Sequence, residues 1–168
     1  MNIEVLGGNV LDIPADVLIS TANPWLQMTG GVNLAIIVRP QGELVYEELQ
    51  RYLRDTGQRH VEPGTVVCTG PGSLPVKQIL HAVSIARSYD SSVELVAETI
   101  VRALTKAREL GARTVTLPAL ATGFGPLSMT DFATALARAI ERDWDHLETL
   151  KIVLRHEEDA ETVRGVLR

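Results

Sequence analysis

Two glycine-bearing segments carry the strongest sign of ligand binding in this sequence. The first is Thr29-Gly30-Gly31-Val32 and the second is Ala121-Thr122-Gly123-Phe124-Gly125. Backbone N–H groups in such turns, and in the first turn of a following helix, have no partner within the helix, and the helix dipole adds roughly half a positive charge there. Both segments therefore predict a site for an anion such as a phosphate, without any need for lysine or arginine.

Each segment also has a purely structural interpretation, in which its glycines only supply positive φ angles to tight turns. Neither segment fits the two best-known phosphate-binding loops, because no Gly-Lys-Ser/Thr follows and the spacing Gly-x-Gly-x-x-Gly is absent. Asn23, six residues before the first segment, is similarly explained by an Asx turn before Pro24. The structural and the ligand-binding interpretations both remain open at this point.

Composition narrows the class of protein. The 168 residues contain 16 Lys+Arg against 21 Asp+Glu, a net charge of −5, which argues against nucleic acid as a partner held by bulk phosphate neutralisation. The four histidines lie in different predicted elements without metal-ligand spacing, so we expect neither a metal nor a cofactor. A single cysteine, Cys68, and the lack of any apolar stretch of about 18 residues predict a cytoplasmic protein without a membrane segment.

The elements that must position the two turns alternate along the chain. The apolar patterns predict strands over residues 3–6, 17–21, 65–69, 78–82, 114–117 and 150–154, and helices over 33–39, 43–56, 128–144 and 157–167. A further helix is predicted to start after Ser91, which has capping-box spacing to Glu94, and to stop at Gly111. This alternation predicts an α/β layered fold and a single domain over residues 1–168. Since both turns follow predicted strands, we expect them at the same edge of the sheet, where ligands of such folds bind.

Several motifs occur in an order that is known from one family. Gly8-Asn9-Val10-Leu11 stands where that family has Gly-Asp-Ile-Thr, and Asp16-Val-Leu-Ile-Ser-Thr-Ala-Asn23 is similar to its Asp-Ala-Ile-Val-Asn-Ala-Ala-Asn strand. Thr29-Gly30-Gly31-Val32 is similar to its Gly-Gly-Gly-Val turn, and Leu117-Pro118-Ala119 before Thr122-Gly123 also matches. The chain therefore resembles the macrodomain family, an ADP-ribose-binding module, from Leu6 to the C-terminal helix.

The resemblance implies a three-layer α/β/α sandwich with a central, mixed but mostly parallel six-stranded sheet. It also implies a cleft at the strand ends that holds ADP-ribose or an ADP-ribosylated protein. Main-chain amides of the two turns would hold the diphosphate, Asn9 and Val10 would meet the adenine, and Asn23 would face the distal ribose. The implied ligand-binding residues are Asn9, Val10, Asn23, Thr29, Gly30, Gly31, Val32, Ala121, Thr122, Gly123, Phe124 and Gly125.

Four residues depart from the family pattern. Asn9 replaces an aspartate, so a charge-assisted hydrogen bond to adenine becomes a neutral one. The binding free energy falls by roughly 1 kcal/mol as a result. Thr29 replaces a glycine and would be strained if its φ were positive. Pro126 stands near a position that is often glycine, and proline offers no amide. Asn33 stands where hydrolytic members have an aspartate that helps to orient a water.

These departures leave three functions to separate. Asn23 and Asn33 are the catalytic candidates, but a neutral amide at position 33 cannot act as a general base at pH 7. The first function is therefore an ADP-ribose binder with slow or absent mono-ADP-ribosyl hydrolase activity. The second is a binding or scaffold protein of the same fold, whose cleft has diverged to bind another nucleotide or has lost ADP-ribose binding. The third, RNA binding, is disfavoured by the charge and by the presence of only seven aromatic residues.

Overall fold

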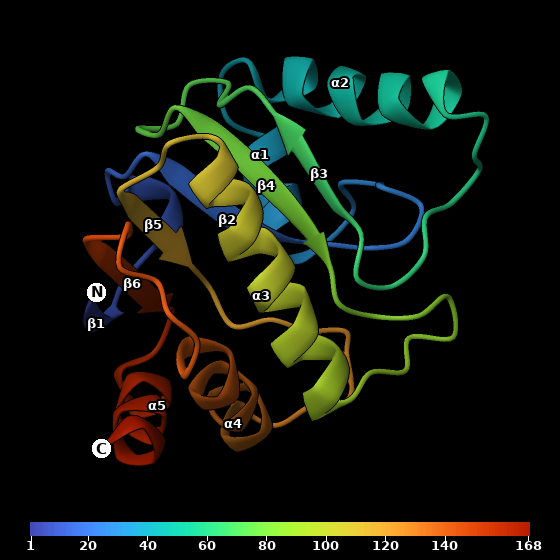
Figure 1. Cartoon of the computed structure of the whole chain (residues 1–168). Helices are drawn as coiled ribbons and strands as arrows, with labels where there is room; N and C mark the ends of the chain where they lie inside the picture. Colours follow the sequence, from blue (N-terminus) through green and yellow to red (C-terminus); the bar gives the residue numbers. More distant parts are fainter.

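A six-stranded sheet forms the centre of the computed structural model, which describes residues 1–168 (Figure 1). Its strands are β1 (Asn2–Gly7), β2 (Val17–Ala22), β3 (Val66–Thr69), β4 (Gln78–Val83), β5 (Thr114–Leu117) and β6 (Thr149–Leu154). They lie in the order β1-β6-β5-β2-β4-β3, and every neighbouring pair is parallel except β3 and β4. The predicted mixed, mostly parallel sheet is confirmed, and five of its six strands end at the same edge.

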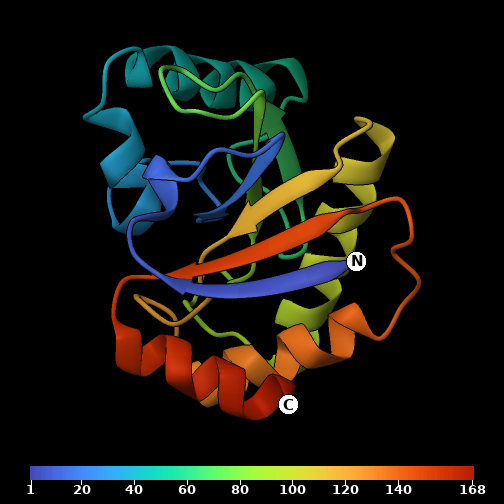
Figure 2. The same ribbon diagram turned by 90° about the vertical axis from the view of Figure 1, so that its left-hand side faces the viewer.

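Five helices cover the two faces of this sheet. They are α1 (Gly31–Ile37), α2 (Gly42–Asp55), α3 (Val93–Glu109), α4 (Met129–Ile140) and α5 (Glu157–Leu167), with a short 3₁₀ turn at Val10–Asp12. Helices α1 and α2 lie on one face and α3, α4 and α5 on the other (Figures 1 and 2), as the α/β/α prediction required. None of them combines the length and the apolar character that crossing a lipid bilayer requires.

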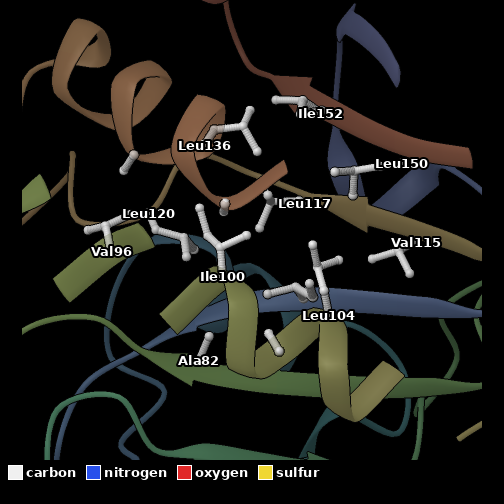
Figure 3. Close-up of a cluster of buried hydrophobic side chains, with 14 of the residues drawn as sticks. Ala82, Val96, Ile100, Leu104, Val115, Leu117, Leu120, Leu136, Leu150 and Ile152 are labelled. Atoms are coloured by element: carbon white, nitrogen blue, oxygen red, sulfur yellow. The ribbon is translucent and has the colours of Figure 1, made fainter. Parts of the chain in front are cut away.

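The core has two halves, one on each face of the sheet. Ile100 and Leu104 of α3 pack beside Leu117 and Ile152 of the strands (Figure 3). On the opposite face, side chains of α1 and α2 such as Leu49 pack against the strands. Strands that are buried on both faces carry apolar residues almost continuously, which is why no alternating pattern marks them in the sequence.

Helix α3 begins one residue later than the sequence indicated. Ser92, not Ser91, is its N-cap residue, and the Ser92 hydroxyl oxygen accepts a hydrogen bond from Leu95 N at 3.0 Å. The Ser91 hydroxyl donates instead to the backbone oxygen of Ser84 at 2.6 Å. The predicted stop is confirmed, because Gly111 follows the helix with a φ of +73°.

Helix α4 is shorter than predicted. It begins after Ser128, where Ser128 and Asp131 form a reciprocal capping box, but it ends at Ile140 and does not reach Trp144. Trp144 is buried, and its indole N–H donates to the backbone oxygen of Ala139 at 3.0 Å. Its apolar ring therefore covers the end of the helix without continuing it.

The Asp16 carboxylate forms hydrogen bonds that connect the starts of three strands. Asp16, directly before β2, accepts a bond from Lys77 Nζ at 2.7 Å and from the backbone N atoms of Arg113 and Thr114 at 2.9 and 3.0 Å. Lys77 precedes β4, Arg113 precedes β5, and Thr114 is the first residue of β5. The hydrogen bond from Lys77, together with the two backbone N–H groups, holds the pKa of Asp16 well below its ordinary value of 3.8.

We predict that Asp16→Ala lowers the free energy of unfolding by about 1 kcal/mol at pH 7, because the backbone N–H groups of Arg113 and Thr114 and the Lys77 ammonium lose their acceptor. A carboxylate whose pKa is depressed by folding stabilises the protein above its ordinary pKa and loses that contribution as the pH falls below it. The difference between the two proteins in urea unfolding should therefore narrow between pH 5 and pH 3. Asp12→Ala is the control, since the Asp12 side chain is 59% exposed beside Arg39. An equal loss in both variants, or a constant difference across pH, would contradict the role of Asp16.

Candidate functional site

A single large cleft lies at the edge of the sheet where the parallel strands end. Its volume is about 1080 Å³. Residues that follow β1, β2, β4, β5 and β6 line it, so it crosses the ends of all five parallel strands. Its only charged side chains are Arg155 and Asp159, which with His156 all follow β6. The centre of the cleft therefore contains no lysine or arginine side chain.

The structure brings every sequence-predicted site residue into this cleft. The predicted residues are far apart in the sequence, and they come from the end of β1, the end of β2, the start of α1 and the loop after β5. All of them line the cavity: Asn9, Val10, Asn23, Thr29, Gly30, Gly31, Val32, Asn33, Ala121, Thr122, Gly123, Phe124 and Gly125.

The first loop presents free backbone donors at the start of α1. Gly30 is extended, with φ −163°, and Gly31 is left-handed, with φ +59°. The N–H groups of residues 30–33 donate to no protein acceptor. Thr29 is exposed and does not have a positive φ, so the strain expected from its side chain is absent.

The second loop, residues 121–125, follows β5 and lies beside the first loop because β5 pairs with β2. Its left-handed residue is Ala121, with φ +59°, whereas Gly123 and Gly125 do not have a positive φ. Gly125 is needed for a different reason, since a Cβ atom there would collide with the backbone of Ala121. Leu127 N donates to Ala121 O at 3.1 Å and closes the loop, while the N–H groups of residues 122–125 have no protein acceptor.

Phe124 connects the two loops across the cleft. Its side chain is 73% exposed, the largest exposed aromatic surface in the protein. A Cβ atom on Gly30 would collide with the edge of the Phe124 ring, so this ring lies directly against the backbone of the first loop. The absence of a side chain at Gly30 is therefore what allows the ring to reach across.

The Asn23 side chain organises the loop between β2 and α1. Its oxygen accepts from Trp25 N and Gln27 N, both at 3.1 Å, and its nitrogen donates to Gln27 O at 2.9 Å. The Asx-turn interpretation of Asn23 is therefore correct for its contacts within the protein. One N–H of the amide keeps no protein partner, at a residue that lines the cleft.

Asn33 belongs to a buried polar cluster beneath the first loop. The Ser20 hydroxyl donates to the Asn33 side-chain oxygen at 2.8 Å, and the Asn33 nitrogen has no partner although the residue is only 2% exposed. His81 pairs with Ser20 across β2 and β4, and its Nε2 lies 2.9 Å from the Thr69 hydroxyl. Complete burial lowers the pKa of His81 to about 3, so the ring is neutral at pH 7. The cluster contains no carboxylate, and no base faces Asn33 from this side.

Asn9 caps the 3₁₀ turn that follows β1. Its side-chain oxygen accepts from Leu11 N at 3.0 Å, and the N–H of Val10 has no protein acceptor. One lone pair of the Asn9 oxygen and the amide nitrogen stay free at this end of the cleft.

Several cleft residues were missed by sequence reasoning. Gln27, Ser84 and Tyr89 line the cavity beside β2 and β4, and Arg155 and His156 line it beyond β6. The search for glycine turns could not find them, because none lies in such a turn. Their common signal is their position after the carboxyl end of a strand, which alone would have nominated them.

Trp25, in the loop after β2, lies next to a residue that lines the cleft. Trp25 does not line the cleft, but its ring lies 6.1 Å from that of Tyr89, which does. Trp25 therefore lies behind Tyr89, a residue of the cleft wall.

The sequence matches one protein family over most of its length. The family model of the Macro domain covers residues 19–136. This chain belongs to the macro domain family. The matched range contains both glycine loops, whereas Asn9 and α5 lie outside it.

Relatives and solved structures extend the match beyond this range. An uncharacterized protein of Pyrobaculum aerophilum is 32% identical over 154 residues, which cover 92% of this chain and 82% of the relative. A macrodomain of Oceanobacillus iheyensis, solved with MES bound, shares the fold with a TM-score of 0.84 and 23% identity over 96% of this chain and 87% of its own. A Trypanosoma brucei macrodomain in complex with ADP-ribose has a TM-score of 0.84 and 19% identity over 99% of this chain and 69% of its own.

The second loop of this macro domain offers a matched pair of glycine variants. We predict that Gly125→Ala lowers the free energy of unfolding by at least about 1 kcal/mol, because the new methyl group collides with rigid backbone. Gly123→Ala should change it by less than about 0.5 kcal/mol, since nothing lies within 4 Å of an added Cβ. Urea unfolding of both variants at pH 7 measures the difference. Equal effects would show that the loop is not closed against Ala121 as described.

Proposed function

We propose that this macro domain, as one domain over residues 1–168, binds ADP-ribose or a closely related ADP-ribosyl compound in the cleft. The observation that supports this most strongly is the pair of facing loops, whose backbone N–H groups at residues 30–33 and 122–125 have no acceptor in the protein. The Trypanosoma brucei macrodomain of the same fold, which is solved with ADP-ribose, supports the identity of the ligand.

The free amides suit a diphosphate in both charge and shape. Each phosphate oxygen accepts several hydrogen bonds, and two facing rows of N–H groups satisfy two adjacent phosphates without a cation. Arg155 is the one arginine that lines the cleft. It belongs to the segment after β6 and to neither of the two loops. A net charge of −5 repels a long polyanion, whereas a short dianion is held by local geometry.

The two ends of the ligand follow from the direction of the cleft. Adenine lies at the β1 end, where Asn9 keeps a free lone pair and Val10 a free N–H. The distal ribose lies at the β2 end, beside the free N–H of Asn23. Phe124, which spans the loops, covers the part of the ligand between them.

The departures from the family pattern leave this site usable. Pro126 offers no N–H, but the four residues before it keep theirs without a protein acceptor. Thr29 introduces no left-handed strain. Asn9 replaces a charged acceptor with a neutral one, which weakens adenine binding without preventing it.

We predict an affinity order of ADP-ribose above ADP and ADP above AMP, because each step removes a group that the cleft contacts. Isothermal titration calorimetry at physiological salt measures it. Oligoadenylate should show no binding. A cleft that has lost its ligand would give no heat with any of these compounds, and a preference for oligoadenylate would favour RNA binding.

A matched pair of variants locates any binding in this cleft. Gly30→Ala, whose Cβ displaces the Phe124 ring, should weaken ADP-ribose binding at least fivefold. Gly165→Ala, which adds a methyl group in open space on α5 outside the cleft, should leave it within twofold.

Hydrolysis of an ADP-ribosyl bond requires a base near the distal ribose. A water oxygen forms a bond to the anomeric carbon, the bond to the attached group breaks with its electron pair, and the water proton goes to a base. Asp159, the carboxylate that lines the cleft, belongs to α5, whereas Asn23 and Asn33 lie at the β2 end. Any hydrolysis is therefore slow, with an oxygen of the substrate's own diphosphate as the proton acceptor.

We predict that Asn33→Asp accelerates the release of ADP-ribose from a mono-ADP-ribosylated protein by at least about 100-fold. The Ser20 hydroxyl, which now donates to the Asn33 oxygen, would donate equally to a carboxylate and favour its ionised form. Initial rates at pH 7 measure the effect, with Asn33→Leu as a control that should be no faster than wild type. An Asn33→Asp protein that binds ADP-ribose normally but gains no rate would show that Asn33 does not face the reacting carbon.

A further inference from the structure

The cleft continues one strand beyond the predicted position of the distal ribose. Ser84, Ile85 and Tyr89, which follow β4, line this extension together with Gln27. Strand β4 is the neighbour of β2 on the side away from β5, so the extension adds one strand spacing of about 4.8 Å. This length accommodates one planar group beyond the ribose.

Tyr89 is the aromatic side chain of the extension and is held in an unusual conformation. Its φ is +66°, a left-handed value that costs a tyrosine on the order of 1 kcal/mol, and its side chain is 48% exposed. A tight turn fixes it, because Tyr89 N donates to Ala86 O at 2.9 Å and Ala86 N donates to Asp90 O at 2.8 Å. The backbone therefore presents a half-exposed ring at the wall of the cleft.

Trp25 supports this ring from outside the cleft. The two ring centroids are 6.1 Å apart with an angle of 41° between the planes. The loop of Trp25 is itself fixed by the Asn23 amide and by a bond from Val61 N to Pro24 O at 2.7 Å. Tyr89 is thus packed on one side and accessible on the other, as a stacking surface must be.

The charges around the extension permit a cation. No lysine or arginine lines it, since Arg155 follows β6, and the exposed Arg87 of the same turn does not line the cleft. The side-chain oxygen of Gln27 accepts a hydrogen bond from the Tyr46 hydroxyl at 2.9 Å. The exposed Asp90 directly follows Tyr89 in the chain, and the face of a tyrosine ring attracts planar cations.

From these contacts we propose that the extension is a subsite for a planar cation joined to the anomeric carbon of the distal ribose, stacked on Tyr89. This subsite rests on the proposed function, because it is reached only by a ligand whose ADP-ribosyl part fills the rest of the cleft. Two compounds carry such a group: a nicotinamide dinucleotide, with its pyridinium ring, and a protein ADP-ribosylated on arginine, with its guanidinium.

The test compares ligands on wild type, Tyr89→Leu and Tyr89→Phe by calorimetry. Tyr89→Leu should weaken the binding of NAD or of an arginine-linked ADP-ribosyl peptide at least about fivefold, the lower end of aromatic stacking energies. Tyr89→Leu should change the affinity for ADP-ribose and for a serine-linked ADP-ribosyl peptide less than twofold. Tyr89→Phe should bind all of these ligands as wild type does. Whichever of the two cationic ligands responds identifies the source of the planar group, and thermal unfolding checks that both variants are folded.

Three results would overturn the subsite. Equal weakening of all ligands by Tyr89→Leu would make Tyr89 a wall of the ribose site only, and no weakening of any ligand would remove it from the cleft. A response confined to the serine-linked peptide would exclude a planar cation. In each of these cases ADP-ribose still binds, so the proposed function stands, whereas wild type that fails to bind ADP-ribose would overturn both.

Discussion

Backbone N–H groups without an acceptor, at the edge where the parallel strands end, are the feature on which the cleft depends. Strands β2 and β5 are neighbours, so the loops that follow them lie side by side, and both line the same cleft with residues whose N–H groups have no protein acceptor. Each loop maintains this arrangement with a backbone that few residues tolerate. Gly31 and Ala121 are left-handed, and Gly125 lies too close to Ala121 for any side chain. Backbone donors that no protein group satisfies, next to the start of a helix, favour an anion at this edge of the sheet.

The side chains and backbone groups that line the cleft change in chemical character along its length. Charged side chains gather beyond β6, free amides occupy the centre, and the paired rings of Trp25 and Tyr89 stand beside β4. Between the amides and the rings lies Asn33, whose oxygen is held by Ser20 and whose surroundings contain a neutral histidine and no carboxylate. The surroundings of Asn33 therefore contain hydrogen-bonding groups but no carboxylate that could act as a general base.

Much of the fold follows from local sequence, whereas the proposed site residues follow from the two glycine loops together with the resemblance to the family. Apolar runs mark the strands, and glycines mark the two loops, because burial and close backbone approach leave direct traces in residue type. Features that depend on distant contacts left no such trace. Ser91 and Ser92 are equivalent by spacing, and the tertiary bond from Ser91 to Ser84 O decides which of them caps α3.

In the site, too, some features follow from local sequence and others depend on contacts between distant residues. The left-handed residue of the second loop is Ala121 and not a glycine, because packing against Leu127 and Gly125 sets the backbone there. Tyr89 lies in a turn without glycine, so only its position after the carboxyl end of β4 marks it as a cleft residue. The bond from Ser20 to Asn33 joins residues thirteen positions apart and exists only because α1 crosses over β2.

A crystal structure of this macro domain with ADP-ribose tests the account most directly. The account predicts the diphosphate within about 3.2 Å of main-chain nitrogens from both residues 30–33 and residues 122–125, with no lysine or arginine side chain on either phosphate. A diphosphate held instead by Arg155, or a ligand bound outside the cleft, would contradict the claim that backbone amides hold the anion.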